Sequence, residues 1–166
     1  MKLNLFSFGK LKTPGLRQAA DYYKRLAKPW VTLQEIELKP LPIPEKTPQT
    51  RNKIQVKEGL LLLDRMKTNP LSKGSIYFLL DEMGKLKPTC QWAQDFKHWE
   101  HQGISSLSFC IGSSLGFSEE VRQKAQEVIS LGPQTLSHEL ARVVFFEQVY
   151  RAFSWIRGHP YHNEGS

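Results

Sequence analysis

The regular alternation of strand-like and helix-like segments along the 166 residues constrains the fold of this chain more than any other feature. Short apolar or alternating stretches predict β-strands. They lie at residues 2–9, 31–38, 75–81, 106–111 and 128–131. The segments between them have helical spacing or helix-start signals. They lie at residues 15–27, 51–66, 89–99, 119 onwards and 138 to about 157. Such alternation is typical of an α/β fold with a mainly parallel sheet.

Length and composition predict one domain over residues 1–166 and exclude a wholly disordered chain, because 40% of the residues are hydrophobic. Prolines at four positions within nine residues, from Pro40 to Pro48, predict a stiff exposed loop inside that domain. Two cysteines are too few for a disulfide framework, and no apolar run reaches the roughly 18 residues of a membrane span. We therefore expect a cytoplasmic protein without a membrane partner.

Positive charge is concentrated in the first half of the sequence. Residues 1–83 contain 15 Lys and Arg against 8 Asp and Glu, whereas residues 84–166 contain 8 of each, which gives the net charge of +7. A basic balance of this size often accompanies binding to a polyanion. For any single lysine, a solvated helix face explains the charge equally simply.

Three loops follow predicted strands, at residues 81–87, 112–117 and 131–137. They are where a ligand is expected, because parallel sheets bind ligands beyond the carboxyl ends of their strands. The loop from Gly112 to Gly116 has glycines that permit close backbone approach, but its spacing matches no nucleotide fingerprint and favours a simple tight turn. The loop from Leu131 to Leu136 contains Gly132 and Pro133, which make it rigid. Its free backbone groups suit a flat heterocycle, and an ordinary loop is the alternative.

Histidines are the most reactive groups near the end of the chain. His138 lies just inside the final predicted helix, where the helix dipole lowers its pKa and favours a neutral base. Pro160 prevents that helix from continuing, so an extended tail carries His159, Tyr161 and His162. A polar helix start and a frayed terminus are the corresponding alternatives. The pair His98 and His101 has no third ligand nearby and predicts no metal site.

The final predicted helix is apolar around most of its circumference. A helix of this kind is buried on two sides, which suggests packing against both its own sheet and a partner subunit. Arg142, Glu147, Arg151 and Arg157 interrupt the apolar surface. Internal salt bridges are a serious alternative to a catalytic role, above all for Glu147 and Arg142.

Five short motifs, in this order, closely resemble the ribosomal RNA large subunit methyltransferase H family, as does the N-terminal Met1-Lys2-Leu3 with Gly9-Lys10-Leu11. The motifs are Leu80-Asp81-x-x-Gly84-Lys85, Phe109-x-Ile111-Gly112-x-x-x-Gly116, Ser130-Leu131-x-x-x-Thr135-Leu136-x-His138, Ala141-Arg142-Val143-x-x-x-Glu147-Gln148-x-Tyr150-Arg151-Ala152, and Arg157-Gly158-His159-Pro160-Tyr161-His162-x-Glu164. The resemblance spans the whole chain, and it is most specific in the C-terminal third.

The resemblance implies a SPOUT-class fold, with a mainly parallel sheet, helices on both faces and a C-terminal trefoil knot. It also implies an enzyme that uses S-adenosylmethionine, without a metal, to methylate N3 of a pseudouridine. The implied substrate is helix 69 of 23S rRNA in the assembled ribosome, and the implied assembly is a homodimer. Physical rules alone would have argued against a knot.

Matching positions imply two sets of site residues. The implied cofactor site consists of Leu80, Gly112, Leu131, Gly132, Pro133, Gln134, Thr135 and Leu136. The implied catalytic cluster consists of His138, Arg142, Arg151, His159, Tyr161 and His162. His138 or His162 could act as a general base, and Arg142 or Arg151 could stabilise a developing anion. The sequence does not decide between the members of either pair.

Three departures from the family pattern bear on function. Ser113 replaces a usual glycine, and it would add about 1 kcal/mol of strain if the position needs a positive φ. Asn163 replaces a basic residue, which removes a charge near the RNA. Ser137 replaces a proline and can cap the same helix. The first two departures support the alternative of a non-catalytic RNA-binding protein. A metal-dependent hydrolase using His159, His162 and Glu164 is a further alternative, but no carboxylate cluster accompanies them.

Overall fold

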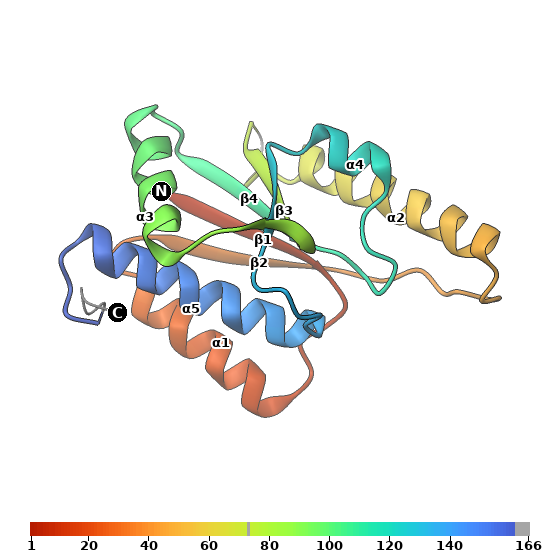
Figure 1. Cartoon of the computed structure of the whole chain (residues 1–166), viewed down its shortest axis with the longest axis horizontal. Coiled ribbons are helices and arrows are strands. Elements are labelled where there is room, and N and C mark those ends of the chain that lie inside the picture. Colours follow the sequence, from red (N-terminus) through yellow and green to blue (C-terminus); the bar gives the residue numbers. More distant parts are fainter. Residues whose placement is uncertain (73, 162–166) are drawn as a thin grey trace.

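The computed structural model describes residues 1–72 and 74–161, and these residues form five strands and five helices (Figure 1). In chain order they are β1 (Lys2–Phe8), α1 (Pro14–Ala27), β2 (Thr32–Leu38), α2 (Pro48–Thr68), β3 (Ile76–Leu86), α3 (Thr89–His101), β4 (Ser106–Ile111), α4 (Glu119–Lys124), β5 (Glu127–Ser130) and α5 (His138–Ile156). The five strands form one sheet in the order β2-β1-β4-β3-β5, and every pairing is parallel. The predicted α/β fold with a parallel sheet is therefore confirmed.

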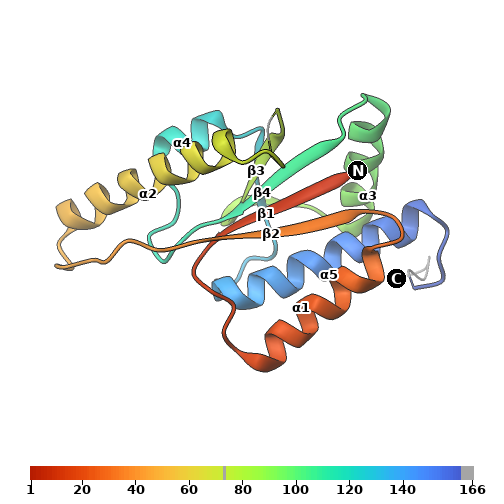
Figure 2. The ribbon, with the colours of Figure 1, turned by 180° about the vertical axis from the view of Figure 1, so that it is seen from behind.

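The helices cover both faces of the sheet, as predicted (Figures 1 and 2). Alternation along β1 sends Leu3 and Leu5 into a core with α1, α3 and α5. The same alternation sends Phe6 and Phe8 into a second core with α2 and α4. Because both faces are buried, the strands read as nearly continuous apolar runs. The trefoil knot and the single domain over residues 1–166 stay predictions.

Strand β3 is longer than predicted, because it continues past Asp81 to Leu86. Its pairing with β5 shifts register between Leu80 and Lys85, so residues 81–84 form an irregularity inside the strand. Gly84 makes this possible, since a Cβ there would lie 2.6 Å from the backbone carbon of Ile129. The predicted loop at 81–87 is therefore largely strand.

Two predicted helix caps have different outcomes. Ser137 caps α5 as predicted, because its Oγ accepts a hydrogen bond from the Leu140 N–H at 3.2 Å. Ser118 precedes α4 but makes no capping bond, so that prediction is wrong. It is buried against α2 instead, where a Cβ at Gly59 would lie 2.4 Å from its hydroxyl. Close packing between α2 and α4 thus uses a side chain that sequence rules assign to capping.

Candidate functional site

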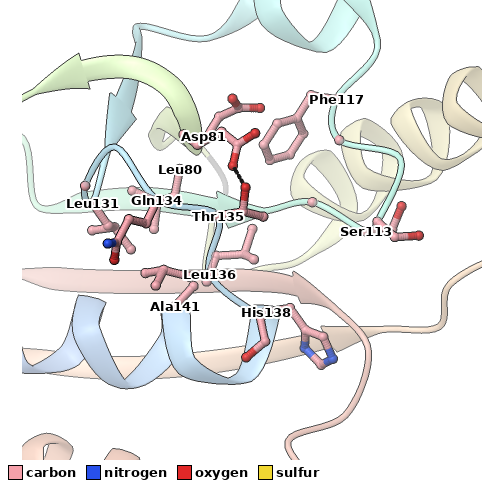
Figure 3. A pocket seen from close by; sticks show the side chains of 17 residues that line it. Leu80, Asp81, Ser113, Phe117, Leu131, Gln134, Thr135, Leu136, His138 and Ala141 are labelled. Atoms are coloured by element: carbon pink, nitrogen blue, oxygen red, sulfur yellow. Dashed lines mark hydrogen bonds between the residues drawn. The ribbon is translucent and has the colours of Figure 1, made fainter.

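A pocket of about 480 Å³ opens beyond the carboxyl ends of the central strands (Figure 3). Two loops, the irregular part of β3 and the first turn of α5 form its wall. The lining residues are Leu80, Asp81, Glu82, Ile111, Gly112, Ser113, Ser114, Gly116, Phe117, Leu131, Gly132, Gln134, Thr135, Leu136, Ser137, His138 and Ala141. The wall is mainly apolar, with a few polar groups that can fix a ligand's orientation, which is the usual character of a small-molecule site.

Seven of the eight residues predicted to bind a cofactor line this pocket. The exception is Pro133, which is exposed at the turn of its loop. The predicted cofactor set left out several lining residues, above all Asp81, Glu82 and Phe117. Their signal was their place in the segments 81–87 and 112–117, which follow apolar strands where a parallel sheet binds its ligands.

Local hydrogen bonds hold the loop at 131–136 in place. The Ser130 hydroxyl donates to the Gly132 carbonyl at 2.6 Å and accepts from the Gly132 N–H at 3.1 Å. Gly132 has a φ of 155°, which few side-chain-bearing residues adopt. The Thr135 hydroxyl donates to the Glu82 carboxylate across the pocket mouth (Figure 3). The loop is thus anchored at both ends while its backbone stays available to a ligand.

The opposite wall, at 112–117, is tied to α2. The Ser113 hydroxyl donates to the buried carboxylate of Glu58 at 2.5 Å and accepts from the Leu115 N–H at 3.2 Å. The Gln55 amide donates to the Leu115 carbonyl at 2.6 Å. No non-glycine residue among those described has a positive φ, so the strain expected at Ser113 is absent. That expectation was wrong because the conformation at this position suits any residue.

His138 lies at the start of α5, and its ring is so close to Gly9 that a Cβ at Gly9 would lie 2.8 Å from the ring's Cε1. Burial lowers the pKa of its imidazole below the ordinary value of 6.5, and the positive charge of Arg142 lowers it further. The direction agrees with the prediction, although burial rather than the helix dipole is the main cause. The imidazole of His138 is therefore mainly neutral at pH 7, and the residue lines the pocket.

Arg142 lies one turn further along α5, and it is completely buried. Its guanidinium pairs with Glu35 at 3.1 Å and with Glu37 at 2.8 Å, and it also donates to the Gly9 carbonyl. These contacts fasten α5 to β2 and to the end of β1. The geometry thus favours the internal salt bridge over direct contact with a substrate.

The other predicted catalytic residues gather at the far end of α5. Arg151 pairs with Glu147 at 2.5 Å, and its guanidinium lies 4.8 Å from the ring centre of Tyr161. The Tyr161 hydroxyl donates to Glu147 at 3.3 Å, and burial raises the pKa of this phenol. His159 packs edge-on against Trp30 at 5.3 Å. His162, the sixth predicted residue, lies outside the described residues.

One chain therefore does not bring the predicted catalytic residues together. His138 and Arg151 are thirteen residues apart on one helix, which separates them by about 20 Å along its axis. The pocket and the cluster of Arg151, His159 and Tyr161, here called the tail cluster, form two separate places on the same chain.

Comparison with known proteins identifies the family of this chain. Residues 1–162 match a family described as "Predicted SPOUT methyltransferase". The chain belongs to this SPOUT methyltransferase family. A protein of Shouchella clausii named "Ribosomal RNA large subunit methyltransferase H" is 34% identical over 163 residues, which cover 98% of this chain and 99% of the relative. Proteins of the same name from Bacillus cytotoxicus and Bacillus thuringiensis are each 37% identical over 164 residues, with the same coverage.

Residues 1–72 and 74–161 contain neither a metal-binding cluster nor a membrane-spanning helix. Within this range, no cluster of three or more His, Cys, Asp or Glu side chains has the arrangement of a metal site. None of the helices in the same range combines the length and apolarity needed to cross a membrane. The pair His98 and His101 lies exposed at the end of α3.

Proposed function

We propose that this protein methylates N3 of a pseudouridine in helix 69 of 23S rRNA on the assembled ribosome, with S-adenosylmethionine as cofactor. The observation that carries the proposal is the pocket beyond β3, β4 and β5, built from the positions that match the methyltransferase motifs. Family membership and near full-length similarity to proteins named for this class of RNA support it. A ribosomal substrate also places the protein in the cytoplasm.

The residues of the pocket fit S-adenosylmethionine. A volume of about 480 Å³ lies in the range of small-molecule sites. Leu131, Leu136 and Ile111 offer apolar surface to an adenine ring, and the backbone of the anchored loop can read its edge. The Glu82 carboxylate at the mouth suits a cationic ligand, whereas that of Asp81 is already paired with Arg122 at 2.6 Å. When bound there, the cofactor supplies an electrophilic methyl group on a sulfonium that is its own leaving group.

The chain's own residues must align the target base and help it to lose its N3 proton. Alignment alone can supply roughly 7–11 kcal/mol of the barrier. His138 is the proposed base, because it lines the pocket and its lowered pKa keeps it neutral. Arg142 is a proposed positioning residue that keeps His138 neutral and in place. Arg151 is the proposed partner of the developing uracil anion, since its side chain is partly exposed.

A homodimer is proposed as the working form. About 20 Å separates His138 from Arg151 in one chain, so the proposed roles require the tail cluster of one protomer to face the pocket of the other. A partly exposed stripe with Leu140, Val144 and Trp155 runs along α5 and suits such an interface. In a two-fold dimer, both pockets are completed at once.

RNA binding is proposed to combine phosphate contacts with a base stacked on an aromatic ring, for which Tyr161 and Trp155 are candidates. The alternative of a non-catalytic RNA-binding protein loses one of its two supports, because Ser113 is unstrained. Its other support, Asn163, lies outside the described residues.

Two experiments test the proposed function. By mass spectrometry, 23S rRNA from a deletion strain should lack one methyl group. Returning the gene should restore that methyl group. Calorimetry should detect one bound S-adenosylmethionine per pocket. An unchanged methylation pattern in the deletion strain would contradict the proposed reaction, and absence of cofactor binding would favour the non-catalytic alternative.

A further inference from the structure

The cations of the protein differ in how they are paired. Arg17, Lys24, Arg122 and Arg142 are among those that form ion pairs. Six cations on or just before α2 form no ion pair with any carboxylate of the described chain. They are Lys46, Arg51, Lys53, Lys57, Arg65 and Lys67. Glu58, an acidic residue of the same helix, is buried and turned towards Ser113. Asp64, the other acidic residue of α2, is exposed, so the helix has a net positive surface in which cations outnumber carboxylates.

A groove of about 470 Å³ lies at the start of this helix. This groove, here called the α2 groove, is lined by Lys46, Pro48, Arg51, Asn52, Gln55 and Leu115. Four of them carry side-chain N–H donors, and two of those four are cationic. Donors and positive charge in a concave surface suit phosphate and sugar oxygens. The prolines that precede α2 limit the freedom of the segment that presents Lys46.

The α2 groove is only one loop away from the pocket. Leu115 lines the groove, whereas its neighbours Ser114 and Gly116 line the pocket. The Gln55 amide donates to the Leu115 carbonyl at 2.6 Å, and Ser113 donates to Glu58 one helical turn along. These two hydrogen bonds fix the distance between the groove and the pocket. A strand held in the groove would therefore lie at a set distance from the reacting base.

We propose that the α2 groove binds backbone phosphates of the RNA strand that carries the target nucleotide. This inference rests on the proposed function and deepens it, because it assigns the substrate's docking surface to specific side chains. A groove with cations on its wall follows a single nucleic-acid strand better than the flat surface of a membrane. The RNA backbone would then set the register, and the pocket would select the base.

The test compares two double variants with equal loss of charge. Lys46→Gln with Arg51→Gln removes both groove cations, whereas Lys28→Gln with Lys97→Gln removes two exposed cations from the α1 and α3 side of the sheet. Methylation of ribosomes from the deletion strain is measured across a range of salt concentrations. Calorimetry with S-adenosylmethionine serves as the check that each variant is folded.

The groove variant should raise KM for ribosomes about tenfold, with kcat and cofactor affinity nearly unchanged. Its slope of log(kcat/KM) against log salt should become shallower by about 1.4 to 1.8, for two lost phosphate contacts at about 0.7 to 0.9 each. The control variant should match the wild type. Equal KM values and slopes for the two variants would overturn the proposal.

Two further results separate the inference from the proposed function. If the wild type does not methylate ribosomes, the proposed function fails, and the groove is then judged by the salt dependence of equilibrium binding to those ribosomes. If the groove variant loses affinity for ribosomes but keeps its affinity for an isolated 23S rRNA fragment with the target helix, the groove contacts a ribosomal protein. That result would also overturn the proposal.

Discussion

The two ends of α5 carry the two halves of the proposed site, and they are held in different ways. At the first end, Ser137 caps the helix and the fully buried Arg142 ties it to Glu35 and Glu37. At the other end, Arg151 and Tyr161 share Glu147 at a partly exposed surface. The first end is fixed by buried charges before any ligand arrives. The second is held by contacts that a partner surface or an RNA can reach.

This difference indicates a division of labour along one helix. The pocket end uses backbone loops and a buried ion pair, which preorganise a cofactor site. The tail cluster uses rings and a surface ion pair, which contribute little to stability and remain free to contact a substrate. Mutations at the two ends should therefore affect different measurements.

The largest expected effect is on kcat, and subunit complementation tests whether the two ends of α5 act in the same site. His138→Ala and Arg151→Ala should each lower kcat by about 100-fold or more, because one removes the base and the other the anion's partner. Mixing and re-annealing the two variants should restore about a quarter of wild-type activity, since half the dimers are mixed and each has one intact site. Single-turnover methyl transfer measures this. Full loss of activity in the mixture would place both residues in the site of one chain.

The two arginines should separate stability from activity. Arg142→Met removes the buried guanidinium that Glu35 and Glu37 share, so the free energy of unfolding should fall by about 2 kcal/mol. The loss is limited because Glu35 keeps its ion pairs with Arg17 and Lys24. Arg151→Gln breaks a partly exposed ion pair with Glu147, so the free energy of unfolding should fall by less than about 1 kcal/mol. Denaturant unfolding of both variants checks the contrast. Equal losses would mean that the two ends of α5 are held alike.

Much of the fold followed from local pattern. Alternation placed β1 and β4 within a residue, and the Ser137 cap fixed the start of α5. The second half of β3 was not predicted, because residues 81–84 have the composition of a loop. They are part of the strand because Gly84 allows close approach to β5, and the local sequence does not reveal such a contact.

The sequence predicted which loops line the pocket, but not which predicted site residues lie close together. Strand ends and motif positions identified Leu80, Gly112 and the segment at 131–136. The partners of Arg142 come from β2, more than a hundred residues earlier, so no local signal reveals its burial. The buried contact of Ser113 with Glu58 depends likewise on how α2 packs.

The pH dependence of kcat and of stability tests the proposed role of His138 at the pocket end of α5. Because the pKa of His138 lies below 6.5, kcat should fall only as the pH drops through that lowered pKa and stay level above it. The unfolded chain binds the proton more readily, so stability should also be lost as the pH falls from 6.5 through the folded pKa. NMR titration of the His138 ring, assigned with His138→Asn, measures this pKa. A value above 6.5 would remove the argument for a neutral base.

A small effect is also expected from restoring the usual glycine at Ser113. Had the serine been strained, Ser113→Gly would stabilise the protein. Because no positive φ is present and the hydroxyl donates to Glu58, the change should instead lower the free energy of unfolding by about 1 kcal/mol. Cofactor affinity should weaken slightly, since the loop would lose one of its two ties to α2. Denaturant unfolding and calorimetry, with Ser114→Gly as the neighbouring control, distinguish a lost tie from relieved strain.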